Sequence, residues 1–176
     1  MRSPKCTIDS SCLIALDHLD LIPTLSLLFS EVLVPKAVRQ DLFKRRSSKN
    51  RVRSLFAQYA FFKPCDEYDK AAVDVLLVER TGKGFKDRGE AEAVVQAAQT
   101  GASIIIDDLW GRDLAASHSL SYNGTIWILK QLFDLELISA SDLRNHFLSL
   151  RRRRIWLPWG VVNDLLLQIG ELPIKL

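Results

Sequence analysis

The sequence predicts an α/β fold with a parallel sheet, in a single domain. Short β-branched runs, such as residues 32–34 and 104–106, alternate with longer segments that have helical periodicity. This alternation is typical of parallel sheets, because each crossover helix returns the chain to the end of the sheet where the next strand begins. The 176 residues correspond to one domain, 1–176, and we expect a helical extension at the C-terminus from about residue 140.

The first half of the chain contains the first two predicted strands. We expect strands over residues 6–9 and 31–34, helices over 12–16, 23–29 and 36–44, and a loop or helix end over the basic residues 45–53. Asp9, Ser10 or Ser11 supplies the side chain that caps the first helix. Pro35 suits the first turn of the third helix, where its missing N–H removes no hydrogen bond.

The second half is expected to be mostly helical, with two more strands. We expect helices over residues 66–80, 87–100, 109–118, 125–133, 141–150 and 161–169, and strands over 102–106 and 120–122. Gly101 supplies a helix C-terminus, and Asn123 with Gly124 forms a turn. The sequence has no internal repeat and no linker that would divide it into two domains.

Composition excludes several classes of protein. Hydrophobic residues make up 48% and charged residues 26%, which is ordinary for a globular domain and unlike a disordered chain. The three cysteines form no CxxC pair and the three histidines no HExxH pair, so neither a disulfide framework nor a zinc site is indicated. Apolar runs fall short of the roughly 18 residues of a membrane helix, and Asp9 interrupts the stretch that a secretory signal needs. We therefore expect a cytoplasmic protein with no membrane partner.

Carboxylates follow the predicted strands, at the edge where parallel sheets bind ligands. Asp9 ends the first strand, and the pair Asp107 and Asp108 follows the isoleucine-rich strand. Glu90 lies at the N-terminal end of the inward stripe of its helix, and Asp41 has the matching place on the helix after the second strand. Converging carboxylates repel one another, and a Mg²⁺ or Mn²⁺ ion relieves the repulsion and activates water for attack on a phosphodiester. The pattern indicates metal-dependent hydrolysis.

Each of these acids also has a purely structural interpretation. The acids that follow strands would cap the helices behind them. Asp87 and Glu90 have the spacing of a capping box. Glu92 lies off the inward stripe, and we expect it in solvent. Whether Asp107 or Asp108 faces a metal stays open, because adjacent residues after a strand point in different directions.

Basic residues are clustered although the net charge is only +3. The candidates for RNA binding are Arg45, Arg46, Arg151, Arg152, Arg153 and Arg154. Such patches hold phosphates and steer polyanions, and Trp156 and Trp159 beside the second patch would add base stacking. The alternative is that the tryptophans pack the C-terminal helix onto the core while the arginines stay in solvent.

Several segments resemble one family, the PIN-domain nucleases, and within it the prokaryotic branch related to toxins of toxin–antitoxin pairs. They are IDSSCLI at 8–14, VLVPKAVRQDL at 32–42, DRGEAEAV at 87–94, IDD at 106–108, Arg112, NGTI at 123–126, and the terminal WG and GE pairs at 159–160 and 170–171. The resemblance runs nearly end to end. It implies a three-layer α/β/α sandwich around the parallel sheet and a Mg²⁺- or Mn²⁺-dependent endoribonuclease.

The resemblance also implies roles for individual residues and a set of partners. The catalytic acids would be Asp9, Asp41, Glu90 and Asp108, and the metal ligands, directly or through water, Asp9, Glu90, Asp107 and Asp108. Ser10 and Thr125 would position a water or the scissile phosphate. The implied partners are RNA, an antitoxin protein and a second copy of the chain.

Two residues depart from the family pattern and keep other functions open. Asp41 stands where the second acid is usually glutamate, and Trp127 where the related branch has glycine, so that its ring would crowd the cleft. The alternative function is therefore a PIN-like module with weak or no activity that binds RNA or a protein. An unrelated α/β phosphohydrolase is less consistent with the sequence, because Asp9 begins Asp-Ser-Ser rather than Asp-x-Asp.

Overall fold

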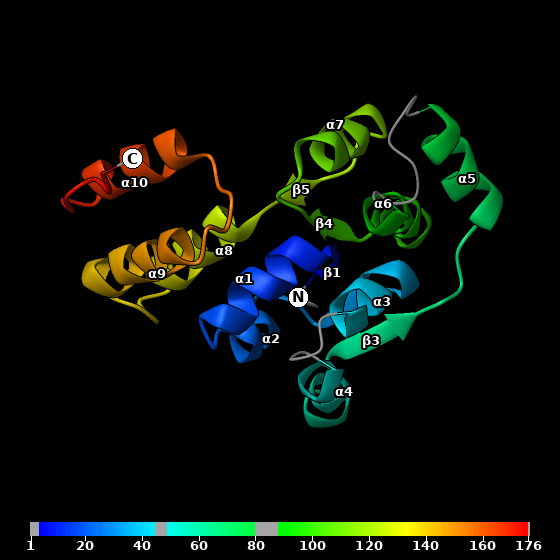
Figure 1. Cartoon of the computed structure of the whole chain (residues 1–176), viewed down its shortest axis with the longest axis horizontal. Coiled ribbons are helices and arrows are strands. Elements are labelled where there is room, and N and C mark those ends of the chain that lie inside the picture. The colour runs from blue at the N-terminus through cyan, green and yellow to red at the C-terminus, as the bar shows by residue number, and fades with distance from the viewer. Residues whose placement is uncertain (1–3, 45–48, 80–87, 176) are drawn as a thin grey trace.

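The computed structural model describes residues 4–44, 49–79 and 88–175 (Figure 1). Its strands are β1 (Lys5–Ile8), β2 (Glu31–Pro35), β3 (Phe62–Cys65), β4 (Ser103–Ile105) and β5 (Tyr122–Asn123). Its helices are α1 (Ser10–His18), the short 3-10 helix η1 (Ile22–Thr24), α2 (Leu25–Leu28), α3 (Lys36–Lys44), α4 (Lys49–Gln58), α5 (Lys70–Glu79), α6 (Arg88–Thr100), α7 (Leu109–Ser117), α8 (Thr125–Asp134), α9 (Ala140–Arg152) and α10 (Trp159–Gln168).

The five strands form one parallel sheet in the order β3-β2-β1-β4-β5. β1 lies in the middle, and Thr7 is level with Leu33 of β2 and with Ile104 of β4. The chain winds in one direction from β1 to β3 and in the other from β4 to β5, so the winding reverses between β1 and β4. In open parallel sheets, ligands bind beyond the carboxyl ends of the strands at such a switch point. The predicted α/β fold with a parallel sheet is confirmed.

Apolar side chains on the two faces of the sheet pack against different helices. On one face, Cys6, Ile8 and Ile105 pack with α1, α2 and α8 in what we call the α1-side core. On the other face, Ile104 and Ile106 pack with α5, α6 and α7 in the α6-side core. The alternation follows from the period of two in a strand, and it gives the three layers of an α/β/α sandwich.

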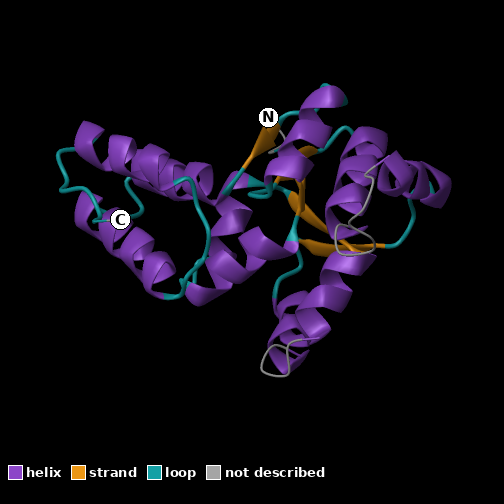
Figure 2. Cartoon of the chain, turned by 45° about the horizontal axis from the view of Figure 1, so that its top comes forward, coloured by secondary structure: helices purple, strands orange, loops and turns teal. Residues whose placement is uncertain are grey.

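The C-terminal helices form a core of their own at one end of the molecule (Figure 2). Phe147 of α9 is completely buried there, beside Leu129 of α8, Leu166 of α10 and Ala15 of α1. α9 begins with a capping box in which Ser139 and Asp142 each bond the backbone N–H of the other. This C-terminal core holds α9 and α10 onto α1 and α8, and thus onto the start of the sheet.

The structure differs from the sequence-based expectation at several places. Pro35 and Asn123, expected in the first turn of a helix and in a turn, are the last residues of β2 and β5. Residues 49–53, expected in a loop or helix end, belong to α4. β3 is not predicted by periodicity, because it is an edge strand that contains Pro64, and only edge strands tolerate proline without loss of pairing. The helix expected from residue 66 begins at Lys70, because the Asp69 carboxylate accepts the Ala72 N–H at 3.1 Å and caps it there.

Among the described residues, no single helix is long and apolar enough to cross a membrane. The bent pair Ser10–His18 and Ile22–Leu28 passes the same test by length and composition only, with a turn of 117° between its halves. Leu13, Leu16 and Leu25 of this pair are buried in the α1-side core.

Candidate functional site

Asp9 directly follows β1 and is the N-cap residue of α1. Its backbone N–H donates to the Ile105 carbonyl at 3.0 Å, which extends the contact of β1 with β4 by one residue. Its Oδ1 accepts the Cys12 N–H at 2.9 Å, and its Oδ2 accepts the Ser11 hydroxyl. The residue is completely buried. Asp9 therefore caps a helix and also brings a carboxylate to the switch point of the sheet.

Asp107 lies just beyond β4 and is held by donors from three other elements. Its Oδ1 accepts the Thr125 N–H at 3.0 Å and lies 3.4 Å from the Arg112 guanidinium. Its Oδ2 accepts the Thr125 hydroxyl at 2.6 Å and the Cys12 thiol at 3.2 Å. Gly124 permits this approach, since a Cβ there would lie 2.3 Å from both Arg112 Nη2 and Asp107 Oδ1. Asp107 thus caps the N-terminus of α8 from outside that helix.

Burial and neighbouring negative charges raise the pKa values of two groups at this site, the Asp9 carboxyl and the Cys12 thiol. Burial first, and the negative charge of Asp107 second, raise the pKa of Asp9 to about 6 against the partly opposing hydrogen bonds from Ser11 and Cys12. Burial and the same two carboxylates raise the pKa of the Cys12 thiol well above its ordinary value. Cys12 therefore stays protonated and acts as a hydrogen-bond donor to Asp107.

Asp108 and Glu90 lie at the first turns of two neighbouring helices. The Asp108 Oδ1 accepts the Gly111 N–H at 3.0 Å and so caps α7, and the residue is half-buried. Glu90 is in the first turn of α6. A Cβ on Gly111 would lie 2.1 Å from Ile106 Cδ1, so glycine lets the first turn of α7 lie against Ile106, and it would lie at ordinary contact distance, 3.5 Å, from the Glu90 Cβ of α6.

Asp41 of α3 lies next to the start of α6. Its Oδ2 is 3.9 Å from the position that a Cβ on Gly89 would take, and Gly89 directly precedes Glu90. Val38 and Leu42, on either side of it along α3, are buried as the amphipathic pattern predicts. The helix pair α3 and α6 therefore brings Asp41 and Glu90 into one neighbourhood.

Glu92 is a site-supporting residue that the sequence analysis misplaces. It is expected in solvent but is only 2% exposed. Its Oε2 accepts the Ala37 N–H in the first turn of α3 at 2.7 Å, and its Oε1 accepts Arg88 Nε at 3.1 Å. A partner 55 residues away in the chain explains the error, because the periodicity of α6 alone carries no information about the end of α3 that packs on it. Glu92 joins α3 to α6 and so supports the placement of Asp41 beside Glu90.

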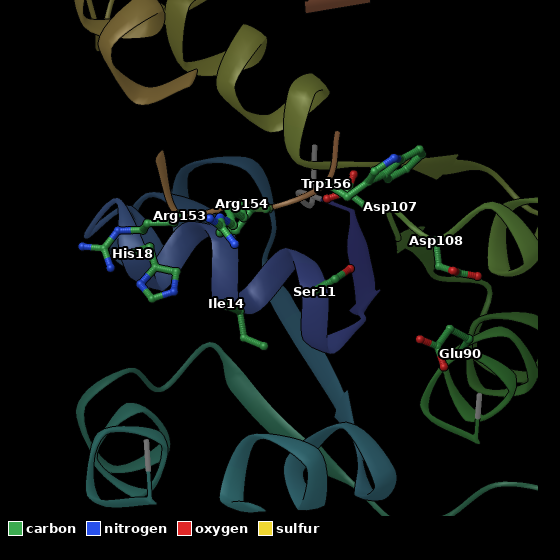
Figure 3. Close-up of a pocket in the computed structure, with 10 residues that line it drawn as sticks. Ser11, Ile14, His18, Glu90, Asp107, Asp108, Arg153, Arg154 and Trp156 are labelled. Atoms are coloured by element: carbon green, nitrogen blue, oxygen red, sulfur yellow. The ribbon is translucent and has the colours of Figure 1, made fainter. Parts of the chain in front are cut away.

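A cavity of about 460 Å³ opens at this edge of the sheet (Figure 3). The charged and aromatic residues that line it are His18, Glu90, Asp107, Asp108, Arg153, Arg154 and Trp156. Figure 3 places the carboxylates of Asp107, Asp108 and Glu90 along one side and Arg153, Arg154 and His18 along the other. The cavity thus lies between the sheet edge and residues 153–156, which connect α9 to α10. The position of His18 in it has no signal in the sequence. Trp156 is expected beside the arginines from the sequence, but nothing in the sequence places it beside the acids.

The remaining predicted residues take the following places. Ser10 is half-buried at the first position of α1, and Ser11 rather than Ser10 lines the cavity and donates to Asp9. Thr125 is buried with its hydroxyl on Asp107. The Trp127 ring lies 6.2 Å from the Phe29 ring, packed on the α1-side core and outside the residues that line the cavity, so the expected crowding is not found.

The basic candidates divide into three groups. Arg45 and Arg46 lie outside the described residues. The Arg151 guanidinium lies over the Trp159 ring, 5.1 Å from its centre, and Arg152 is exposed beyond the cavity lining. Arg153 and Arg154 line the cavity. Asp87, the expected partner of Glu90 in a capping box, also lies outside the described residues.

The donor chemistry at this edge fits a divalent cation. Asp9, Glu90 and Asp108 offer only carboxylate oxygens, the hard ligands that Mg²⁺ and Mn²⁺ prefer. Burial first, and the charge of Asp107 second, raise the pKa of Asp9 to about 6, and a nearby cation would favour its charged form. Within residues 4–44, 49–79 and 88–175, no three His, Cys, Asp or Glu side chains are oriented to hold one ion together. The site therefore fits a cation by its chemistry, and the Asp9 and Asp108 side chains are turned toward the helix N–H groups that they cap.

Comparison with known proteins identifies the family. A family model described as PIN domain (DUF3368) matches residues 5–171, which is nearly the whole chain. The chain belongs to the PIN-domain family. No curated protein matches it.

Membership of the PIN-domain family agrees with the five-stranded parallel sheet and its flanking helices. PIN domains are typically nucleases and typically use divalent metals. In this PIN domain, the carboxylates at the switch point are the groups that such chemistry would use.

The stability of the protein in EDTA should depend on the charge of Asp9. The carboxyl has a pKa of about 6 in the folded state and 3.8 as its ordinary value, so the folded state holds a proton that the unfolded state has lost between these two pH values. Folding stability therefore falls as pH rises from about 4 to about 6, by up to about 3 kcal/mol. Asp9→Asn removes this loss, and urea unfolding at pH 4.5 and 7.5 measures it.

The quantity to compare is the change with pH of the difference between Asp9→Asn and wild type, because an offset from altered hydrogen bonds does not vary with pH. We expect this difference to shift in favour of the variant at pH 7.5. The exposed Asp113→Asn serves as control and should follow wild type at both pH values. A difference that stays constant with pH would contradict the raised pKa.

Removal of the Glu92 side chain should loosen α3 from α6. Glu92→Ala leaves the Ala37 N–H and the Arg88 guanidinium without their buried acceptor, and we expect it to lower the free energy of unfolding by about 2–4 kcal/mol. Glu92→Gln keeps an acceptor for the Ala37 N–H and should lose less. Urea unfolding measures both variants, and equal stability of Glu92→Ala and wild type would show that the bonds do not join the helices.

Proposed function

We propose that this PIN domain is a metal-dependent endoribonuclease that uses Mg²⁺ or Mn²⁺. The observation that carries the proposal is one cavity at the switch point that has carboxylates on one side and arginines on the other. Carboxylates are the groups that hold a divalent cation, and arginines are groups that hold a phosphodiester backbone. A site with both can bring a scissile phosphate to an activated water.

The acidic residues would have different roles at the metal. Asp9, Glu90 and Asp108 would hold the cation, and Asp41 beside the start of α6 would reach it through a water, because aspartate is one methylene shorter than the usual glutamate. The cation, when bound, lowers the pKa of its water toward the working range. Asp107 has both oxygens occupied by Thr125, Arg112 and Cys12, so we assign it the positioning of α8 and an electrostatic role rather than direct ligation.

Arg153 and Arg154 are the proposed phosphate-binding residues, since they line the same cavity as Glu90, Asp107 and Asp108. Arg151 is engaged with Trp159 and would contribute to packing instead. A role as the toxin of a toxin–antitoxin pair, with an antitoxin as protein partner and a homodimer as the assembly, is supported by the resemblance of the sequence motifs alone.

A second candidate function is RNA binding without cleavage. It is favoured by the orientation of the acidic side chains, because in the described part of the chain no three of them are turned to one metal position. In that case, Asp9 and Asp108 would be helix caps and the arginines alone would carry the function.

Cleavage of a mixed pool of structured RNA tests the proposal. We expect purified protein to cut RNA with Mn²⁺ or Mg²⁺ and not with EDTA, and Asp9→Asn to cut at least about 100-fold more slowly because it removes a charged ligand. Asp113→Asn, which makes the same change on the exposed side of α7, should cut like wild type. Cutting by Asp9→Asn at the wild-type rate would reveal a contaminating nuclease, and RNA binding without any cutting would favour the second candidate.

A further inference from the structure

The Cys12 side chain lies with the two buried carboxylates of the switch point. It is completely buried, and its Sγ donates to Asp107 Oδ2 at 3.2 Å. Burial and Asp107 raise the pKa of Asp9, and hydrogen bonding from the Cys12 thiol is among the contributions that lower it. The thiol therefore acts on both carboxylates, although it carries a single proton.

The backbone and the side chain of Cys12 make separate contacts. The backbone N–H donates to Asp9 Oδ1 at 2.9 Å and so takes part in the cap of α1. Every residue except proline has this N–H. The side chain makes the bond to Asp107. A substitution at position 12 can therefore remove the thiol and keep the cap.

Cys12 also differs from the other donors to Asp107 in where it comes from. Thr125 belongs to α8 and Arg112 to α7, whereas Cys12 belongs to α1, the helix that Asp9 caps. The S–H group thus ties Asp107 to the part of the site that holds Asp9. Without it, the two negative charges would face each other with one donor fewer.

A comparison with Cys6 separates packing from hydrogen bonding. Both cysteines are completely buried in the α1-side core. Burial raises the pKa of the Cys6 thiol, whereas burial first, and then the charges of Asp107 and Asp9, raise that of Cys12. Packing of a small side chain accounts for the cysteine of β1, but at position 12 the side chain also supplies a donor to a buried charge.

A hydrogen-bond donor and a cation stabilise the same negative charge. The donor acts in the metal-free protein, where it lowers the free energy of the charged carboxylates. A cation near Asp9 would lower the same free energy by its own charge. The two stabilisations overlap, so each reduces what is gained from the other, and the donor must weaken the binding of the cation.

We propose that Cys12 is a positioning residue that stabilises the metal-free site through Asp107 and Asp9 and thereby lowers the affinity of the site for a divalent cation. The inference rests on the proposed function, because it requires a cation beside Asp9. It concerns the binding of the cation and not the cleavage of RNA, so the two can fail separately.

The affinity for Mn²⁺, measured at neutral pH by the electron paramagnetic resonance signal of the free ion, tests the inference. Cys12→Ala removes the donor, and we expect it to bind Mn²⁺ at least about fivefold more tightly than wild type. Cys12→Ser, which differs from it by one hydroxyl donor, should bind no more tightly than wild type. Cys12→Val, which also lacks a donor but leaves no space for a water, should follow Cys12→Ala.

Urea unfolding gives a second readout that a merely structural role would not produce. Cys12→Ala should lose more stability in EDTA than in saturating Mn²⁺, because the cation takes over the stabilisation of the charge. Cys6→Ala is the matched control, since it removes a buried thiol from the same core, on β1. It should lose the same stability in both conditions and bind Mn²⁺ like wild type.

The outcomes separate this inference from the proposed function. Tighter Mn²⁺ binding by Cys12→Ala supports the inference whether or not the protein cuts RNA. Cleavage by wild type together with unchanged or weaker Mn²⁺ binding by Cys12→Ala overturns the inference while the nuclease proposal stands. Absence of Mn²⁺ binding to wild type would overturn both.

Discussion

The structure depends on two buried carboxylates, Asp9 and Asp107, that follow adjacent parallel strands at the switch point of the sheet. Two like charges in a buried place are unfavourable unless donors surround them. The donors come from the first turn of α1 for Asp9, and from α1, α7 and the first residue of α8 for Asp107. The hydrogen bonds to the carboxylates therefore also fix three helices around the site, and α8 in turn contributes Leu129 to the C-terminal core.

The sequence is sufficient to predict most of the fold, because the decisive signals are local. Alternation of β-branched runs with helical periodicity predicts the parallel sheet, and polar caps and glycines predict the starts and ends of helices. The prediction fails for β3 and α4, where the local signal is ambiguous. β3 contains Lys63 and Pro64 and is stabilised by pairing with β2, while Leu55 and Phe56 of α4 gain their partners only in the α1-side core.

The candidate site is predictable only in part, for a related reason. Asp9 and Asp108 can be located from the sequence because strand ends and helix caps are local features. The support by Glu92 and the cavity contact of Trp156 cannot, because each depends on a contact between elements far apart in the chain. For Trp127, the family pattern leads to a wrong expectation. It predicts that the ring crowds the cleft, but the ring packs against Phe29 at the α1-side core.

Two buried carboxylates at the switch point favour the binding of a cation, because the cation stabilises their charged forms. This expectation is tested most directly by the pKa of the Asp9 carboxyl, measured by ¹³C NMR on protein labelled at the aspartate carboxyl carbons and assigned with Asp9→Asn. We expect a pKa of about 6 without divalent metal and a lower value after Mg²⁺ is added, because a nearby cation favours the charged form. A pKa of about 4 that Mg²⁺ does not change would contradict it.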